Sequence, residues 1–129
     1  MADDKQAVLA SNQAFYRAFE KKDIEAMEAV WSKGISCLCI HPGRDALRGW
    51  QEIRQSWEQI FKNTSYLEID TDILKIDFSG DLAHIVLIEN VLQVSGGRRL
   101  EARSMATNLF ERMGQSWYMT HHHGSPVVD

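Results

Sequence analysis

The N-terminal half of the chain carries apolar side chains at helical spacing. In residues 3–22 apolar positions recur every three or four residues, which predicts an amphipathic helix. Asp23 precedes a second apolar stripe that ends at Trp31, and its carboxylate is placed to cap a second helix. A third stripe runs from Trp50 to Phe61. Three helices are therefore expected in this half of the chain.

The remaining apolar runs predict strands. Residues 35–40 form a short run that ends at His41-Pro42, where proline interrupts a hydrogen-bonded ladder. Beyond residue 65, long runs of alternating character are separated by glycine-containing hairpin signals; they cover 66–78, 82–94, 98–112 and 115–123. Such strands exceed the usual length of about five or six residues. We therefore expect a twisted antiparallel meander that curls around the helices.

One of these runs predicts an interface. The sequence LAHIVLIENVL, residues 82–92, is apolar on both faces over much of its length. A sheet that is covered on one side only would show polar residues at alternate positions there. The convex face of the sheet is therefore expected to be covered as well, most simply by a second copy of the chain. This predicts a homodimer through the convex sheet face.

Length, composition and charge favour a single-domain protein that binds neither nucleic acid nor membrane. The chain has 129 residues, 44% of them apolar, which suits a single domain that spans 1–129. The formal charge of -4 and the scattered Lys and Arg residues argue against nucleic acid and membrane as partners. The sequence shows no signal peptide, so a cytoplasmic location is expected. It shows no glycine-rich phosphate loop or nucleophile elbow, so no cofactor is expected.

The order of these elements resembles a known family over nearly the whole chain. The likeness rests on KKD before the second helix, HPG after the short strand, GWQEI in the third helix and NLFERMGQSWYMTHHHGSP near the C-terminus. These stretches are similar to the SnoaL-like branch of the nuclear-transport-factor-2-like superfamily. The resemblance implies an α+β cone-shaped barrel, with three N-terminal helices packed in the concave face of a curved antiparallel sheet. That scaffold hosts ketosteroid isomerases, polyketide cyclases, dehydratases and non-enzymatic dimerisation domains, so it does not fix one activity.

The residues that act in ketosteroid isomerases are replaced at the matching positions. The resemblance places His41 where those enzymes have an acid directly before a proline. It places Phe15 at the oxyanion tyrosine, with Tyr16 one position away, and Ala106 at the second oxyanion acid. Both oxyanion donors are therefore missing where they are expected. Steroid isomerisation by that mechanism is not predicted.

The same resemblance directs His41 into the cone. Because strand residues two apart share a face, Cys37 and Cys39 are expected there as well. Together with His121 or His123, these residues raise the alternative of a zinc site. Donors spaced in this way along a flat strand lie about 7 Å apart, which is too far for one tetrahedral ion. We therefore expect buried cysteines and no metal.

The C-terminal hairpin is expected to direct two of three consecutive histidines inward. With Met113-Gly114 as the turn, the inward-facing residues are Ser104, Ala106, Asn108, Trp117, Met119, His121 and His123. His122 would then face outward. The other turns place Glu89 beside Ser104 and Thr71 beside Glu89, in a row that ends at His123. A shift of the register by one residue would turn Glu89 outward.

These positions predict a mostly apolar pocket. We expect His41 to act as general acid or base on a small apolar ligand with one polar group, with Glu89 or His123 as its partner. The alternative is a histidine at a strand end that is satisfied by a backbone carbonyl. The residues expected to bind the ligand are Tyr16, Trp31, Trp57, Ser104, Asn108, Trp117 and His121; for the aromatic ones, core packing is the alternative.

Two functions from different classes fit this pattern. One is a cofactor-independent isomerase, cyclase or hydrolase. The other is a non-catalytic dimerisation or ligand-sensing module with a vestigial pocket. An open cone that holds Glu89, His41 or His123 within mutual reach would favour the enzyme, and a cone filled with side chains would favour the module.

Overall fold

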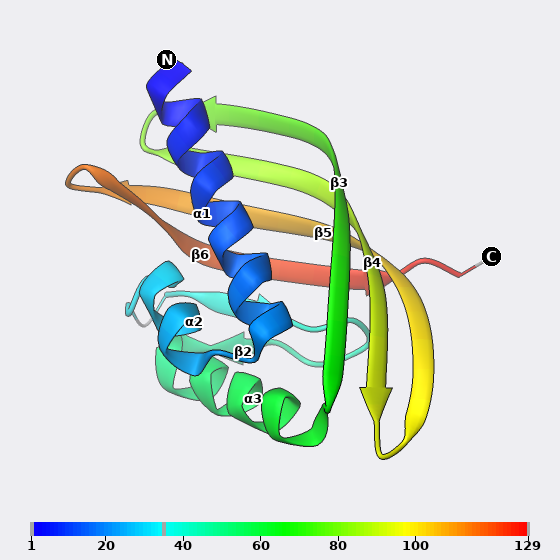
Figure 1. Ribbon diagram of the computed structural model, residues 1–129. Helices are drawn as coiled ribbons and strands as arrows, with labels where there is room; N and C mark the ends of the chain where they lie inside the picture. Colours follow the sequence, from blue (N-terminus) through cyan, green and yellow to red (C-terminus); the bar gives the residue numbers. More distant parts are fainter. Residues whose placement is uncertain (1, 35, 129) are drawn as a thin grey trace.

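The predicted helices are all present. The structure, a computed structural model, describes residues 2–34 and 36–128 (Figure 1). Its helices are α1 (Ala2–Lys21), α2 (Ile24–Val30) and α3 (Gly49–Asn63). Asp23 caps α2 as predicted, because its carboxylate accepts a hydrogen bond from the backbone N–H of Ala26 at 3.1 Å. None of the described helices is long and apolar enough to cross a membrane.

The described residues form one six-stranded sheet. The strands are β1 (Leu38–Ile40), β2 (Leu47–Arg48), β3 (Tyr66–Ser79), β4 (Leu82–Ser95), β5 (Arg98–Met113) and β6 (Ser116–Pro126). They lie in the order β2-β1-β6-β5-β4-β3. The last four form the predicted antiparallel meander, and β1 adds to it by running parallel to β6. The short β2, which the sequence pattern did not indicate, pairs with β1 at the edge.

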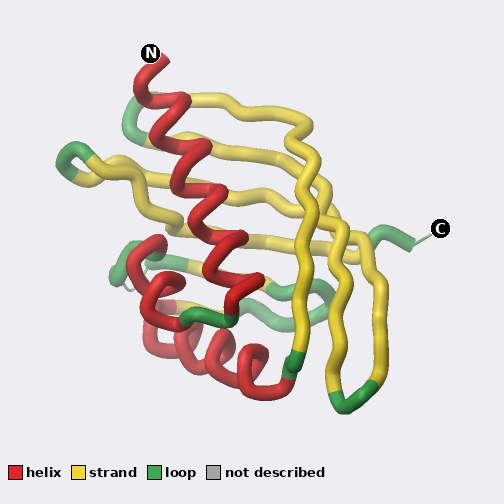
Figure 2. The backbone as a smooth tube through the Cα atoms, in the orientation of Figure 1, coloured by secondary structure: helices red, strands yellow, loops and turns green. Residues whose placement is uncertain are grey.

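The sheet curls around the helices. The long strands bend, and the three helices lie together on one side of them (Figure 2). Side chains from every layer meet in the core; Phe15, Trp31, Trp57, Phe110 and Met119 are all fully buried. Each such side chain contributes roughly 1.5–3 kcal/mol relative to an exposed position. The fold is therefore the predicted α+β cone.

One irregularity in β6 changes which histidines face the core. Phe110 pairs with Met119, but Leu109 pairs with His121, so Thr120 is an extra residue in β6. A bulge of this kind breaks the alternation of faces. Met119 and His122 are therefore both buried, at 0% and 1% exposure, with two outward residues between them.

The facing predicted for the histidine run is wrong for this reason. His123 is exposed and His121 is half-buried on the outer face, whereas His122 faces the core. The turn also differs from the predicted one, because Met113 pairs with Ser116 and the turn residues are Gly114 and Gln115. As a result Ser104 lies opposite Pro126 rather than near His123.

Candidate functional site

A buried carboxyl lies on the concave face of the sheet. Glu89 of β4 is only 4% exposed. It is paired with Thr71 of β3 and with Ser104 of β5, as the hairpin turns predicted. The hydroxyl of Tyr16, from α1, donates a hydrogen bond to Glu89 Oε2 at 2.6 Å. A specific donor from the helical layer therefore holds this carboxyl in place.

The amide of Asn108 joins this pair to a histidine. Asn108 Nδ2 donates to Asn12 Oδ1 at 2.9 Å and to the Tyr16 hydroxyl at 3.1 Å. Asn108 Oδ1 lies 2.6 Å from His122 Nδ1, and because an amide oxygen can only accept, Nδ1 carries the proton. His122 Nε2 is then the unprotonated nitrogen, 4.0 Å from Glu89 Oε2. We call these five residues, Asn12, Tyr16, Glu89, Asn108 and His122, the Glu89 cluster.

Burial controls the protonation of this cluster. Burial raises the pKa of Glu89, and the hydrogen bond from Tyr16 opposes that shift in part. Burial, together with the neighbouring histidines, lowers the pKa of His122 to about 3, so its imidazole is neutral at pH 7. Burial and the adjacent Glu89 carboxyl also raise the pKa of Tyr16. The cluster thus combines a carboxyl that keeps its proton to a higher pH than usual with a neutral imidazole that has a free lone pair.

The predicted acid–base residue His41 lies in different surroundings. It follows β1 and turns toward α3, where its Nε2 lies 2.7 Å from Ser56 Oγ. Its ring packs edge-on against Trp57, with 4.9 Å between ring centroids. Burial and the charge of Arg44 lower the pKa of His41 to about 4. Within the described part of the chain, no hydrogen bond or ion pair joins His41 to Glu89, so the structure does not pair these two predicted residues.

Three residues that were predicted to face into the site, His121, His123 and Trp117, lie outside the Glu89 cluster. His123, expected beside Glu89, and His121, expected to bind the ligand, have ring centroids 6.3 Å apart on the outer side of β6. Trp117 packs against Phe78, with 5.7 Å between ring centroids. Ser104, at 5% exposure, keeps its predicted position beside Glu89.

Two predicted ligand-binding tryptophans belong to the core. Trp31 and Trp57 are fully buried, and the Trp57 ring lies between His41 and His122, with centroid distances of 4.9 and 6.4 Å. Side chains therefore fill this part of the cone. Both indole N–H groups are buried without a hydrogen-bond partner among the described residues.

The cysteines are buried thiols. Cys37 and Cys39 are 1% and 0% exposed and form no disulfide, as predicted. Burial raises the pKa of both thiols, so they remain protonated at neutral pH. Over residues 2–34 and 36–128, no three His, Cys, Asp or Glu side chains are grouped so as to hold a metal ion.

The Glu89 cluster reaches the surface beside α1. A groove of about 420 Å³ lies between α1 and β3, and Asn12, Tyr16 and Thr71 line it. Arg17 and Asp70 place charges of both signs at its edges. A molecule in this groove would meet the polar side of the cluster without displacing the core tryptophans.

Two members of the cluster were missed by the sequence-based prediction. Asn12 lies on the buried stripe of α1, four residues before Tyr16, and a polar residue within an apolar stripe is a signal that could have found it. His122 offered no such signal, because strict alternation places it on the outer face. Tyr16, Glu89 and Asn108 were predicted as site residues, and the structure brings these three together.

The fold and the buried polar cluster define the class of protein. A curved sheet that encloses helices and a polar cluster in this way is the cone of the nuclear-transport-factor-2-like proteins. More narrowly, the chain belongs to the SnoaL-like domain family, whose model matches residues 8–129.

Solved structures of similar proteins point to more than one function. The chain is 28% identical to a protein from Streptomyces avermitilis that is proposed to be a dehydratase of the NTF2-like family; the match covers 100% of both chains with a TM-score of 0.93. It is 26% identical to a proposed calcium/calmodulin-dependent protein kinase type II association domain from Thiobacillus denitrificans, over 92% of this chain and 94% of the other, with a TM-score of 0.83.

A curated relative is longer than this chain. The F-box protein SKIP8 of Arabidopsis thaliana is 27% identical over 123 residues, which are 95% of this chain and 51% of the relative. The chain therefore spans about half the length of that relative.

Proposed function

We propose that the protein is a cofactor-independent enzyme that moves a proton on a small, mostly apolar molecule with one polar group. The reactions that fit are isomerisation, cyclisation and dehydration next to a carbonyl. The observation that carries the proposal is the buried Glu89 carboxyl held by the Tyr16 hydroxyl at 2.6 Å. Similarity to the proposed dehydratase from Streptomyces avermitilis supports it.

Glu89 takes the acid–base role in this proposal. A carboxyl with a raised pKa is closer to the operating pH, where it can both accept and return a proton. Tyr16 holds one carboxyl oxygen, while Glu89 Oε1 makes no hydrogen bond to the described residues and is free to face a substrate. His122 Nε2 lies 4.0 Å from Glu89 Oε2, so in this proposal the carboxyl and the imidazole act on the same polar group of the substrate. His122 can then accept a hydrogen bond from a hydroxyl of the substrate.

The groove between α1 and β3 is the proposed route to the cluster. It brings a ligand to two members of the cluster, Tyr16 and Asn12, which are hydrogen-bonded to Glu89 and Asn108 respectively. His41, which the sequence favoured as general base, has its Nε2 occupied by Ser56. We therefore assign the proton transfer to Glu89 rather than to His41.

Hydrogen–deuterium exchange tests this proposal. Apolar cyclic ketones such as 2-decalone and β-tetralone are incubated with the protein in D₂O, and incorporation at the carbon next to the carbonyl is followed by NMR. We expect the wild type to accelerate the exchange and Glu89→Gln to lose about 100-fold or more of that acceleration. Glu68→Gln, which changes an exposed carboxyl, should behave as the wild type. Equal rates with the wild type and Glu89→Gln would reject the proposed role of Glu89.

A second candidate function is a non-catalytic module that dimerises or senses a ligand. The filled region around Trp57 supports it, and so does the separation of His41 and His123 from Glu89, which is the arrangement expected for such a module. The similarity to a proposed kinase association domain supports it as well. The proposed interface is the convex face of the sheet, where Val86, Ile88 and Leu109 are only partly buried in the single chain. Light scattering coupled to size exclusion should then give a dimer that Ile88→Lys converts to a monomer, while Leu100→Lys does not. A monomeric wild type would reject this interface.

A further inference from the structure

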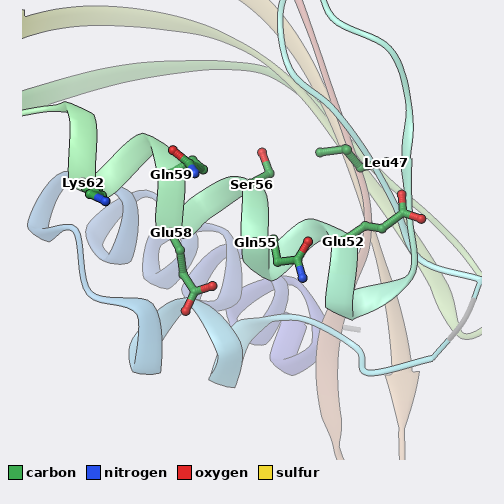
Figure 3. Close-up of a pocket in the computed structure, with 7 residues that line it drawn as sticks. All are labelled: Leu47, Glu52, Gln55, Ser56, Glu58, Gln59 and Lys62. Carbon is green, nitrogen blue, oxygen red and sulfur yellow. The ribbon is translucent and has the colours of Figure 1, made fainter.

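A second polar pair lies on the other side of the helical layer. Ser56 of α3 lines a hollow of about 440 Å³ that is closed on one side by Leu47 of β2 (Figure 3). The Ser56 hydroxyl lies 2.7 Å from His41 Nε2 and has no other hydrogen-bond partner among the described residues. Both residues are partly buried, and the pair is separate from the Glu89 cluster.

The surroundings of His41 keep its imidazole neutral. Its pKa is lowered to about 4, so at neutral pH the lone pair of Nε2 is available to the Ser56 proton, although the ring is a weaker base than an ordinary histidine. The edge-on contact with Trp57 fixes the plane of the ring. Cys39 Sγ lies 3.8 Å from the same Nε2, but its thiol is fully buried and its pKa is raised. The hydroxyl of Ser56 is therefore the group that a reagent in the hollow would meet first.

A hydrogen-bond donor lies one helical turn away. Gln59 follows Ser56 by three residues, so the two side chains are neighbours on the helix surface; Figure 3 shows both on the same side of α3, with Glu58 pointing the opposite way. Gln59 Oε1 accepts a hydrogen bond from Asn63 Nδ2 at 3.4 Å. In this orientation the Gln59 NH₂ group has no hydrogen-bond partner among the described residues and can donate toward the hollow.

We propose that Ser56 is a nucleophile toward small neutral esters, with His41 as its base and Gln59 as a donor to the oxyanion. In this step Ser56 Oγ attacks the ester carbonyl carbon and His41 Nε2 takes the hydroxyl proton. The Gln59 NH₂ group faces the negative oxygen of the tetrahedral intermediate. When the bond to the alcohol breaks, His41 returns the proton to the leaving oxygen, and water later hydrolyses the acyl-serine.

The lining of the hollow limits the substrate. Leu47 offers an apolar contact for a short acyl chain. Glu52 and Lys62 carry opposite charges and Glu58 points away from Ser56, so the lining offers no net charge to pair with a charged ester. Short, uncharged esters are therefore the class that this site would accept.

Acylation by 4-nitrophenyl acetate tests the proposal. We expect a burst of 4-nitrophenolate and an acetyl group that peptide mass spectrometry locates at Ser56. Ser56→Ala and His41→Gln should each reduce the burst rate about 10-fold or more, and Gln59→Ala should reduce it about 10-fold. Ser65→Ala, which removes an exposed serine, should leave it unchanged. An unacetylated Ser56 in the wild type, or an undiminished burst in Ser56→Ala, would overturn the proposal.

A measurement on the wild type covers the case in which His41→Gln does not fold. Because the pKa of His41 is about 4, the acylation rate should rise as the pH rises through about 4 and then level off well below pH 7. A rate that keeps rising tenfold per pH unit from 6 to 9 would show that free hydroxide, and not His41, removes the proton. That result would also overturn the proposal. Neither measurement depends on Glu89.

Discussion

The hydroxyl of Tyr16 donates to Glu89 Oε2 across 2.6 Å inside the cone. The same two residue types form a bond of the same length on the surface, from Tyr66 to Glu68. Removing the buried donor leaves a desolvated carboxyl less well satisfied, so Tyr16→Phe should lower the free energy of unfolding by about 1–3 kcal/mol. Tyr66→Phe should change it little, because water replaces the lost partner.

Urea denaturation of the two variants measures this difference, and NMR titration adds a second readout. Because the Tyr16 bond opposes the rise in the pKa of Glu89, that pKa should rise further in Tyr16→Phe. Equal losses of stability in the two variants would contradict the role assigned to burial.

The buried imidazole of His122 should make stability depend on pH. Its folded pKa, about 3, lies below the ordinary value of 6.5. The folded state therefore binds fewer protons than the unfolded chain between these pH values, and the free energy of unfolding should fall as the pH falls below 6.5. Each pH unit can remove up to about 1.4 kcal/mol. His41, with a pKa lowered to about 4, contributes in the same direction.

Urea unfolding at pH 7, 6 and 5 measures this slope. His122→Asn should reduce it, whatever the variant does to stability at pH 7. Ser65→Ala alters an exposed residue that does not titrate between these pH values, and it should keep the slope of the wild type. An unchanged slope in His122→Asn would show that this ring is not held neutral by the fold.

The bulge at Thr120 predicts an unusual deletion phenotype. Met119 and His122 are separated by two outward residues, so deleting Thr120 restores regular alternation and leaves both side chains inside. We expect this variant to fold, with a loss of about 1–2 kcal/mol and with the His122 Nδ1 proton still visible by NMR. Deleting Tyr118 instead shifts Trp117 out of phase and should cost about 3 kcal/mol or more. Similar losses from the two deletions would contradict the bulge.

A close approach at Gly124 gives another test. A methyl group on Gly124 would lie 3.1 Å from Cγ and 3.2 Å from Cδ of Pro42, so Gly124→Ala should lower the free energy of unfolding by about 1–3 kcal/mol. At Gly34 the nearest atom to such a methyl group is 3.7 Å away, which is ordinary contact. Gly34→Ala should therefore leave the free energy of unfolding nearly unchanged. Thermal unfolding of both variants measures the difference, and a similar fall of the thermal midpoint in both would contradict the close packing of Gly124 against Pro42.

The parts of the fold that depend on residues close together in the sequence were predictable. The helices follow from their apolar stripes and the meander from its alternation and glycine turns. Short turns also fix the register of adjacent strands, so the pairing of Glu89 with Thr71 and Ser104 could be counted from the sequence. This is why the predicted site contained Glu89 and Asn108, whereas Tyr16 was included as one of the aromatic residues that could contact a ligand.

The parts that depend on distant contacts were not predictable. The extra residue in β6 is visible only in how β6 pairs with β5, and no residue type at Thr120 signals it. It decides that His122, and not His121 or His123, enters the cone. The partner of His41 was missed for a similar reason, because Ser56 lies on α3 and reaches His41 only through the folded arrangement.

The parallel pairing of β1 with β6 has a consequence for folding kinetics. Residues 38–40 pair with residues 121–123, so this ladder closes a loop that contains most of the chain. Hairpins form on a timescale of about 1–10 μs, whereas contacts between distant parts of a sequence form more slowly. We therefore expect the C-terminal hairpins to assemble early and β1 to dock late. During synthesis on a ribosome, β6, which forms the edge of the sheet that accepts β1, is made after all three helices, so the nascent helices and β1 are exposed before this edge exists.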